Sequence, residues 1–186
     1  MTKLSIILPT FNRVNHLDAW LKNHLQYINS HDVEICILNN ASTDETKLLL
    51  EKFTLQLNII NQKKTVFVGR NIIDGIFRSE GQYIWIVGDT YHISPELFEE
   101  VYQKIDKHNV VTSLQWMPKH TALRGKIYTP DERAEIQGMS SCITASIHRR
   151  SDLTKDIYEK ISKSYFPHTV LLYVSTIGTG RSIYLT

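Results

Sequence analysis

The sequence has few cysteines, no surplus of one charge and no long hydrophobic run. Its two cysteines, Cys36 and Cys142, form no Cys-x-x-Cys motif, which excludes a zinc ribbon or a thioredoxin-type site. We expect both to be buried thiols. The 21 basic and 19 acidic side chains leave a formal charge of +2, so electrostatics do not support a protein that coats nucleic acid.

The apolar run nearest the N-terminus covers only residues 4–8, too short for the core of a signal peptide. No stretch approaches the roughly 18 apolar residues of a membrane span. We therefore expect a cytoplasmic protein that can contact the inner face of the cell membrane. Apolar residues make up 42% and charged residues 22% of the 186 residues, which are ordinary globular values. At roughly 150 residues per domain, this predicts a single domain over residues 1–186.

Short apolar runs alternate with amphipathic segments over the first 115 residues, which predicts an open α/β sheet with right-handed crossovers. The expected strands are 4–8, 33–38, 57–60, 82–87 and 109–115. Helices are expected at 13–28, 70–79 and 95–107, and the second of these has Ile72, Ile73, Ile76 and Phe77 on one face. A further helix, capped by Ser42 or Thr43, is expected to carry Leu48, Leu49 and Phe53. Later in the chain we expect a loop or small hairpin at 118–130, a strand at 141–148, a helix at 150–163, an ambiguous segment at 166–176 and a strand at the end.

Ligands of open parallel sheets bind beyond the carboxyl ends of the strands. Polar residues follow each of the first four expected strands, which predicts a ligand crevice at this edge. The segments are PTFNR from Pro9, NNASTD from Asn39, the stretch from Lys63 to Asn71, and GDTYH from Gly88. The sequence has neither G-x-G-x-x-G after the first strand nor a P-loop, so a dinucleotide-binding site or an NTPase is disfavoured.

The same segments carry a family resemblance. SIILPTFNR, LNNASTDET and GRNIIDGIFRSEGQYIWIVGD follow one another in the order and spacing of the N-terminal half of a family-2 inverting glycosyltransferase with the GT-A fold. The string WIVGD is most similar to the abequosyltransferase-type bacterial subgroup, which works on lipopolysaccharide or capsule sugars. The resemblance covers about residues 3–96. It implies an α/β GT-A-like fold with an open, mixed, mostly parallel sheet flanked by helices.

The resemblance also implies roles for single residues. Pro9, Thr10 and Asn12 would form the first nucleotide-contacting turn, and Asn39 and Asn40 would contact the base. Arg70 and Asn71 would lie near the ribose and the diphosphate. Asp89 would be the carboxylate of the acidic metal motif. An asparagine amide can bond a uracil edge because it holds both a donor and an acceptor.

The sequence departs from the family at the metal motif, where Thr90 and Tyr91 replace expected carboxylates. A weakly held Mn²⁺ or Mg²⁺ is then expected on Asp89, since Mg²⁺ can bind one carboxylate plus phosphates and waters. His92 could add a ligand to Mn²⁺. Alternatively, Arg70, Lys63 or Lys64 offsets the charge of the diphosphate without metal. These alternatives stay open on the sequence.

The family's acidic catalytic base has no evident counterpart. His168 is the first candidate, because its ordinary pKa near 6.5 suits proton abstraction. Asp131 and Glu132 are weaker candidates. Relatives usually continue with further helices, so we expect a truncated or compact version of the family domain. Residues 139–150 resemble, more loosely, the segment near the acceptor, and Trp116 could stack on a sugar.

The resemblance predicts a hexosyl-type inverting glycosyltransferase of surface polysaccharide or lipopolysaccharide biosynthesis. Its expected partners are a nucleotide-sugar donor, first of all a UDP-sugar, and a glycan or lipid-linked acceptor. Residues 1–96 would form the donor half and residues 97–186 the acceptor half. Lys160 and Lys163, with Arg149 and Arg150, could contact anionic lipid. The alternatives are a catalytically impaired nucleotide-sugar-binding module and, less favoured, a nucleotidyltransferase.

Overall fold

The structure, a computed structural model, describes residues 2–106, 144 and 146–164 with their side chains, and the backbone of three strands at 109–112, 127–128 and 182–185. The elements are β1 (Leu4–Thr10), α1 (Val14–Ile28), β2 (Val33–Asn39), α2 (Thr46–Glu51), β3 (Asn58–Asn61), α3 (Val68–Arg78), β4 (Tyr83–Ile86), α4 (Pro95–Lys104), β5 (Asn109–Thr112), β6 (Ile127–Tyr128), β7 (Ser146–Arg149), the 3₁₀-helix η3 (Arg150–Asp152), α6 (Lys155–Ser162) and β8 (Ser182–Leu185).

The strands form one mixed sheet in the order β3-β2-β1-β4-β7-β5-β8-β6. The pairs β3–β2, β2–β1, β1–β4 and β5–β8 are parallel, whereas β7 runs antiparallel to β4 and β5, and β6 runs antiparallel to β8. The chain moves outward from β1 through β2 to β3 and then returns to the other side of β1 as β4. This reversal creates a topological switch point between β1 and β4, the place where open α/β sheets bind ligands.

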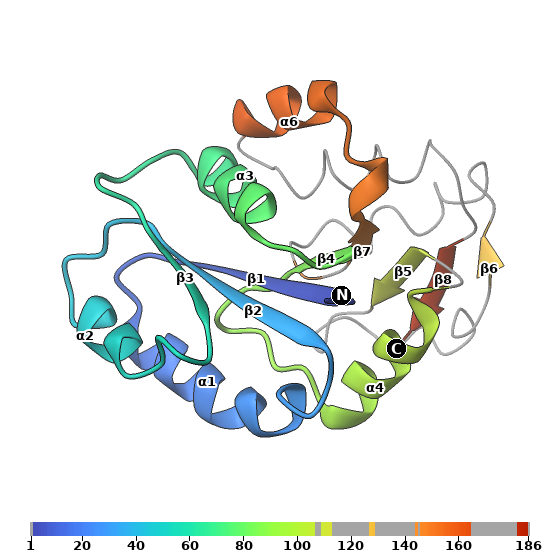
Figure 1. Cartoon of the computed structure of the whole chain (residues 1–186), viewed down its shortest axis with the longest axis horizontal. Helices are drawn as coiled ribbons and strands as arrows, with labels where there is room; N and C mark the ends of the chain where they lie inside the picture. The colour runs from blue at the N-terminus through green and yellow to red at the C-terminus, as the bar shows by residue number, and fades with distance from the viewer. Residues whose placement is uncertain are drawn as a thin grey trace.

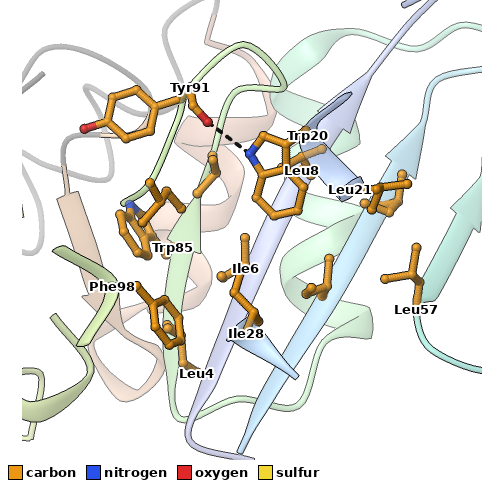
Figure 2. Close-up of a cluster of buried hydrophobic side chains, with 14 of the residues drawn as sticks. Leu4, Ile6, Leu8, Trp20, Leu21, Ile28, Leu57, Trp85, Tyr91 and Phe98 are labelled. Atoms are coloured by element: carbon orange, nitrogen blue, oxygen red, sulfur yellow. Dashed lines mark hydrogen bonds between the residues drawn. The ribbon is translucent and has the colours of Figure 1, made fainter. Parts of the chain in front are cut away.

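Helices cover both faces of the sheet (Figure 1): α1, α2 and α4 lie on one face, and α3 and α6 on the other. Successive side chains of a strand point to opposite faces. Leu4, Ile6 and Leu8 of β1 therefore join the core under α1 and α4, which Figure 2 shows around Trp20, Trp85 and Phe98. Ile7 joins the second core under α3 and α6. Because β1 is buried on both faces, its sequence is a nearly continuous apolar run.

The expected GT-A-like architecture is confirmed for the sheet and its flanking helices, but three local expectations are wrong. Phe77 does not share the buried face of α3: it is 64% exposed, and its ring centroid lies 4.4 Å from that of Tyr158 on α6. The helix α2 begins at Thr46 without a cap from Ser42 or Thr43, and ends before Phe53.

The expected helix at 150–163 is divided into η3 and α6. The guanidinium of Arg150, the first residue of η3, donates to Gly81 O, Ile76 O and Ser79 Oγ and so ties this segment to the end of α3. The ambiguous segment 166–176, Cys142, Trp116 and residues 113–115 lie outside the described residues.

A close approach of α3 to α6 generates a stability prediction. A Cβ on Gly69 would lie 2.2 Å from Ile161 O, a backbone atom that cannot rotate away, whereas a Cβ on Gly75 would lie 2.7 Å from the Leu38 side chain. We expect Gly69→Ala to lower the free energy of unfolding by about 2–3 kcal/mol, because overpacking here moves a helix. Gly75→Ala is the control within the same helix and costs less, about 1 kcal/mol, because a side chain can adjust. Urea titration measures both; equal losses would contradict this account.

Candidate functional site

The expected rim lies at the carboxyl ends of β1, β2 and β3 and in the turn after β4. Because β1 and β4 are neighbours, the end of β1 and the turn after β4 meet directly: Thr10 Oγ1 lies 3.4 Å from Asp89 Oδ2. Pro9 is half-buried and pairs in register with Leu38 of β2. The structure thus brings the first and fourth polar segments together at the switch point.

The turns after β1 and β2 are locked together by Asn12. Its backbone lies in the left-handed region (φ 53°), which asparagine tolerates better than most residues. Asn12 Oδ1 accepts from Thr43 N at 2.7 Å, and Asn12 N donates to Ser42 Oγ at 3.0 Å. Both amide and hydroxyl partners come from the segment after β2. Asn12 therefore fixes the relative position of two rim turns.

Asp44 completes this lock. Its carboxylate accepts from Val14 N at 3.1 Å and from Thr46 N at 3.1 Å, which are the first residues of α1 and α2. Slight burial by itself would raise the pKa of Asp44, but the hydrogen bonds from Thr46 and Val14 outweigh it, and the pKa is lowered. One carboxylate thus serves two helix N-termini, where negative charge is favourable.

Asn39 and Asn40 both lie at the rim, and both amides bond within the protein. Asn39 is 3% exposed; it donates from Nδ2 to Asn61 Oδ1 at 2.8 Å and accepts from Ser42 N at 3.0 Å. Asn40 bonds the backbone of Val66 twice, accepting from its N and donating to its O, each at 2.9 Å. The two bonds from Asn40 to Val66 hold the loop that leads into α3.

Arg70 and Asn71 point in different directions. Arg70 is 61% exposed and pairs with Asp74 at 3.0 Å, one turn along α3. Asn71 is 2% exposed; its amide accepts from Gln62 Nε2 at 3.2 Å and donates to Leu38 O at 3.4 Å. In this structure Asn71 ties α3 to β2, and Arg70 is the one of the pair that faces solvent.

Asp89 is 8% exposed and is paired with Arg13, whose Nε lies 2.9 Å from Asp89 Oδ2. Burial raises the pKa of this carboxyl, and the charges of Arg13 and His16 together with the Thr10 hydroxyl offset part of the rise. Gly88 N, next to Asp89, donates to Thr144 Oγ1 at 3.1 Å. The segment that loosely resembled the acceptor side therefore reaches the rim at Thr144.

A cavity of about 270 Å³ opens beside Asp89, between α1 and the turn after β4. Trp20 Nε1 donates to Tyr91 O at 3.0 Å (Figure 2), and His24 Nε2 accepts from Ile93 N at 3.0 Å. His24 must then carry its proton on Nδ1, which lies 2.6 Å from Trp20 O. Burial lowers the pKa of His24, in agreement with a neutral ring. These bonds fix the turn that presents Asp89.

The donor set does not fit a divalent cation well. In the described parts of the chain no three histidine, cysteine, aspartate or glutamate side chains gather as a metal site. The single carboxylate of Asp89 already bonds Arg13, and Thr90 is exposed without offering a charge. His92 is exposed, and its ring packs against that of His24 at 5.1 Å. A hard cation needs several oxygen ligands, and the protein supplies few here.

Sequence reasoning placed Arg13 and Asp44 in the polar segments of the rim but assigned them no role, and it did not include Gln62. The signal for Asp44 was the string STDET, which carries helix-start residues, but the choice among Ser42, Thr43 and Asp44 depended on where Asn12 lies. The expected base His168 and the weaker candidates Asp131 and Glu132 lie outside the described residues.

Comparison with known proteins identifies the family of the chain. The sequence matches the family model described as Glycosyl transferase family 2 over residues 5–173. The chain belongs to glycosyl transferase family 2. A segment of 91 residues is 35% identical to the abequosyltransferase RfbV of Salmonella typhimurium, covering 46% of this chain and 27% of that protein.

A second relative is the poly(ribitol-phosphate) β-N-acetylglucosaminyltransferase TarS of Staphylococcus aureus, 27% identical over 115 residues, which cover 59% of this chain and 20% of TarS. The matched segments therefore span about a quarter of RfbV and a fifth of TarS. The fold agrees with the family. The crystal structure of S. aureus TarS 1-349 superposes with a TM-score of 0.75 at 18% identity, covering 98% of this chain and 58% of that chain. The mannosyltransferase PcManGT from Pyrobaculum calidifontis, in complex with GDP-Man and Mn²⁺, superposes with a TM-score of 0.66 at 12% identity, covering 98% and 54%.

The described residues contain no helix that is both long and apolar enough to cross a membrane. The rim of this family-2 chain is thus carried by a sheet with two helical layers. Its turns are held by side chains of the rim itself.

The double cap formed by Asp44 gives a prediction. We expect Asp44→Ala to lower the free energy of unfolding by about 1–2 kcal/mol at pH 7, because two helix N-termini lose an acceptor. Asp44→Asn, which keeps one acceptor, is expected to cost less. Since the pKa of Asp44 is depressed on folding, its contribution is present above the unfolded pKa near 3.9 and disappears as pH falls through the folded value. Denaturant titrations at pH 7 and pH 3 check this; a deficit in Asp44→Ala that did not shrink at pH 3 would count against it.

Proposed function

We propose that this chain transfers a sugar from a nucleoside-diphosphate sugar to a hydroxyl of a glycan or lipid-linked acceptor, with inversion. The observation that carries the proposal is the rim at the switch point, where Thr10, Asn12, Asn39, Asn40 and Arg70 lie around the ends of three parallel strands in a family-2 chain. Residues 1–96 would form the donor half, and residues 97–186 would contribute the acceptor side.

A UDP-sugar is the first donor to test. Solved complexes of TarS contain UDP and UDP-GlcNAc, and the mannosyltransferase complex contains GDP-Man. Asn40 is half-buried, and its amide keeps a second N–H and a second oxygen lone pair that could bond a base edge, whereas the amide of Asn39 is 3% exposed. In this structure both are held by internal bonds, so they are already fixed in position before a nucleotide arrives.

In the proposed reaction the acceptor oxygen attacks the anomeric carbon, and the bond from that carbon to the diphosphate oxygen breaks in line with the attack. The electron pair leaves with the nucleoside diphosphate, and the acceptor proton passes to a base, for which His168 stays the candidate. Arg70 would bond the diphosphate from α3. The structure of the similar mannosyltransferase PcManGT contains Mn²⁺. We derive no step from a metal, because the one carboxylate of Asp89 is already paired with Arg13 and does not by itself form a metal site.

A lipid-linked acceptor would bring the end of α6 near a membrane. Lys160 and Lys163 are exposed at the end of α6 and could contact anionic headgroups. Arg150 is not part of this proposal, because its guanidinium is bonded to backbone carbonyls of Ile76 in α3 and of Gly81 before β4.

Ligand binding to the folded state should raise the melting temperature. At about one hundred times its Kd, a nucleotide stabilises the fold by about 2.7 kcal/mol, which for a chain of this size corresponds to roughly 5–10 °C. We expect UDP to produce this shift in a thermal melt, with CDP, GDP and dTDP as the comparison set. If all four at saturation leave the melting temperature unchanged, the nucleotide site is not where we place it. Binding without hydrolysis or transfer over a panel of donors and acceptors would favour the catalytically impaired binding module.

The exposed guanidinium of Arg70 gives a second prediction. We expect Arg70→Ala to weaken UDP binding by about ten- to one-hundred-fold and uridine binding by less than about twofold, because charge-assisted bonds to phosphate are worth roughly 1.5–3 kcal/mol. Arg78→Ala, at the far end of the same helix and also exposed, is the matched control and should bind both as the wild type does. Calorimetry measures the four affinities. Equal losses for UDP and uridine would show that Arg70 does not contact the diphosphate.

A further inference from the structure

The ion pair between Arg13 and Asp89 lies at the switch point but has no part in the function proposed so far. Arg13 lies three residues after the end of β1, at the N-cap of α1, and Asp89 belongs to the turn after β4. The guanidinium Nε lies 2.9 Å from Asp89 Oδ2, and Thr10 Oγ1 lies 3.4 Å from the same oxygen. The side chain is therefore held at the edge of the sheet that faces the proposed donor.

The two residues of the ion pair differ in burial. Asp89 is 8% exposed, whereas Arg13 is 42% exposed, so the guanidinium covers the carboxylate and faces outward. Among the described residues, Asp89 is the ion-pair partner of Arg13, and the pair joins Asp89 to Nε of the guanidinium. The two terminal nitrogens of the guanidinium thus remain for another acceptor. The N–H groups of these two nitrogens point in parallel and match the paired oxygens of a phosphate.

The charges around Asp89 favour an anion. A cation site needs a surplus of carboxylates, but here one carboxylate faces a guanidinium, and His16 adds positive charge when it is protonated. The second family carboxylate is replaced by Thr90, which is exposed and neutral. Arg13 therefore supplies positive charge directly beside Asp89.

We propose that Arg13, positioned by Asp89, bonds the diphosphate of the donor and supplies the positive charge that a metal ion would otherwise supply to the leaving group. This rests on the proposed function. When the bond from the anomeric carbon to the diphosphate oxygen breaks, the electron pair goes to that oxygen, and the guanidinium stabilises the new charge through N–H···O bonds without giving up a proton. Asp89 acts as a positioning residue, because it orients the guanidinium and does not itself touch the donor.

The test is calorimetry of UDP and uridine on the full chain, in EDTA and again with Mn²⁺. We expect the wild type to bind UDP in EDTA, with an affinity that Mn²⁺ changes by less than about twofold. Arg13→Met should weaken UDP binding in EDTA by about ten- to one-hundred-fold and leave uridine within about twofold. Lys22→Met is the matched control: Lys22 is on the same helix and also ion-paired, to Asp18, but lies outside the site, so binding should not change.

Arg13→Met leaves Asp89 buried without its partner and could unfold the protein for that reason. The double variant Arg13→Met/Asp89→Asn avoids this, because it removes both charges and keeps the net charge of the wild type. We expect it to melt as a folded protein and still to lose UDP affinity in EDTA by tenfold or more. Arg13→Lys, which keeps the charge but not the forked donors, should fall between the wild type and the double variant.

Two results would overturn the inference: a wild type that binds UDP only when Mn²⁺ is added, or a double variant that binds UDP in EDTA as tightly as the wild type. In both cases nucleotide binding itself, and with it the proposed function, survives. If the wild type binds none of UDP, CDP, GDP and dTDP with or without Mn²⁺, the proposed function fails and the role of Arg13 fails with it.

Discussion

The parallel pairing of β1 with both β2 and β4 is the constraint on which the rest of the molecule depends. Four residues of β1 pair with β4 and seven with β2, while its side chains enter the two cores in alternation. Because the strands are parallel, their carboxyl ends share one edge. Because β2 and β3 are added on one side of β1 and β4 on the other, Thr10 after β1 and Asp89 after β4 become neighbours at that edge. The position of the candidate site thus follows from strand pairing.

The rim is held by its own polar side chains. Asn12 and Asp44 join the turns after β1 and β2, Asn40 holds the loop before α3, and Trp20 holds the turn after β4. The conformational entropy of these turns is therefore lost when the protein folds and not again when a ligand binds, which favours tight binding. The buried ring of His24 and the double cap of Asp44 belong to the same arrangement, although neither needs to touch a ligand.

Electrostatics separate this chain from the pattern it resembles. A rim with several carboxylates attracts a cation, which then binds the diphosphate. Here the sole carboxylate at the motif is covered by Arg13, while Arg70 faces solvent from α3. Two guanidiniums at one rim favour direct binding of an anionic donor. The replacement of a carboxylate by Thr90 and the ion pair of Asp89 are then two parts of one arrangement.

The sequence by itself determined the elements with strong periodicity: β1, β2 and β4 as apolar runs, α1 and α3 as amphipathic helices, and the family through the order of its motifs. Only the tertiary structure decided that Phe77 meets Tyr158, that Arg150 bonds the end of α3, that Asp44 serves two helices and that Arg13 pairs with Asp89. Periodicity is a property of neighbouring residues, so it can be read locally. Each of these contacts joins residues from different segments, and their distance depends on how the sheet brings those segments together.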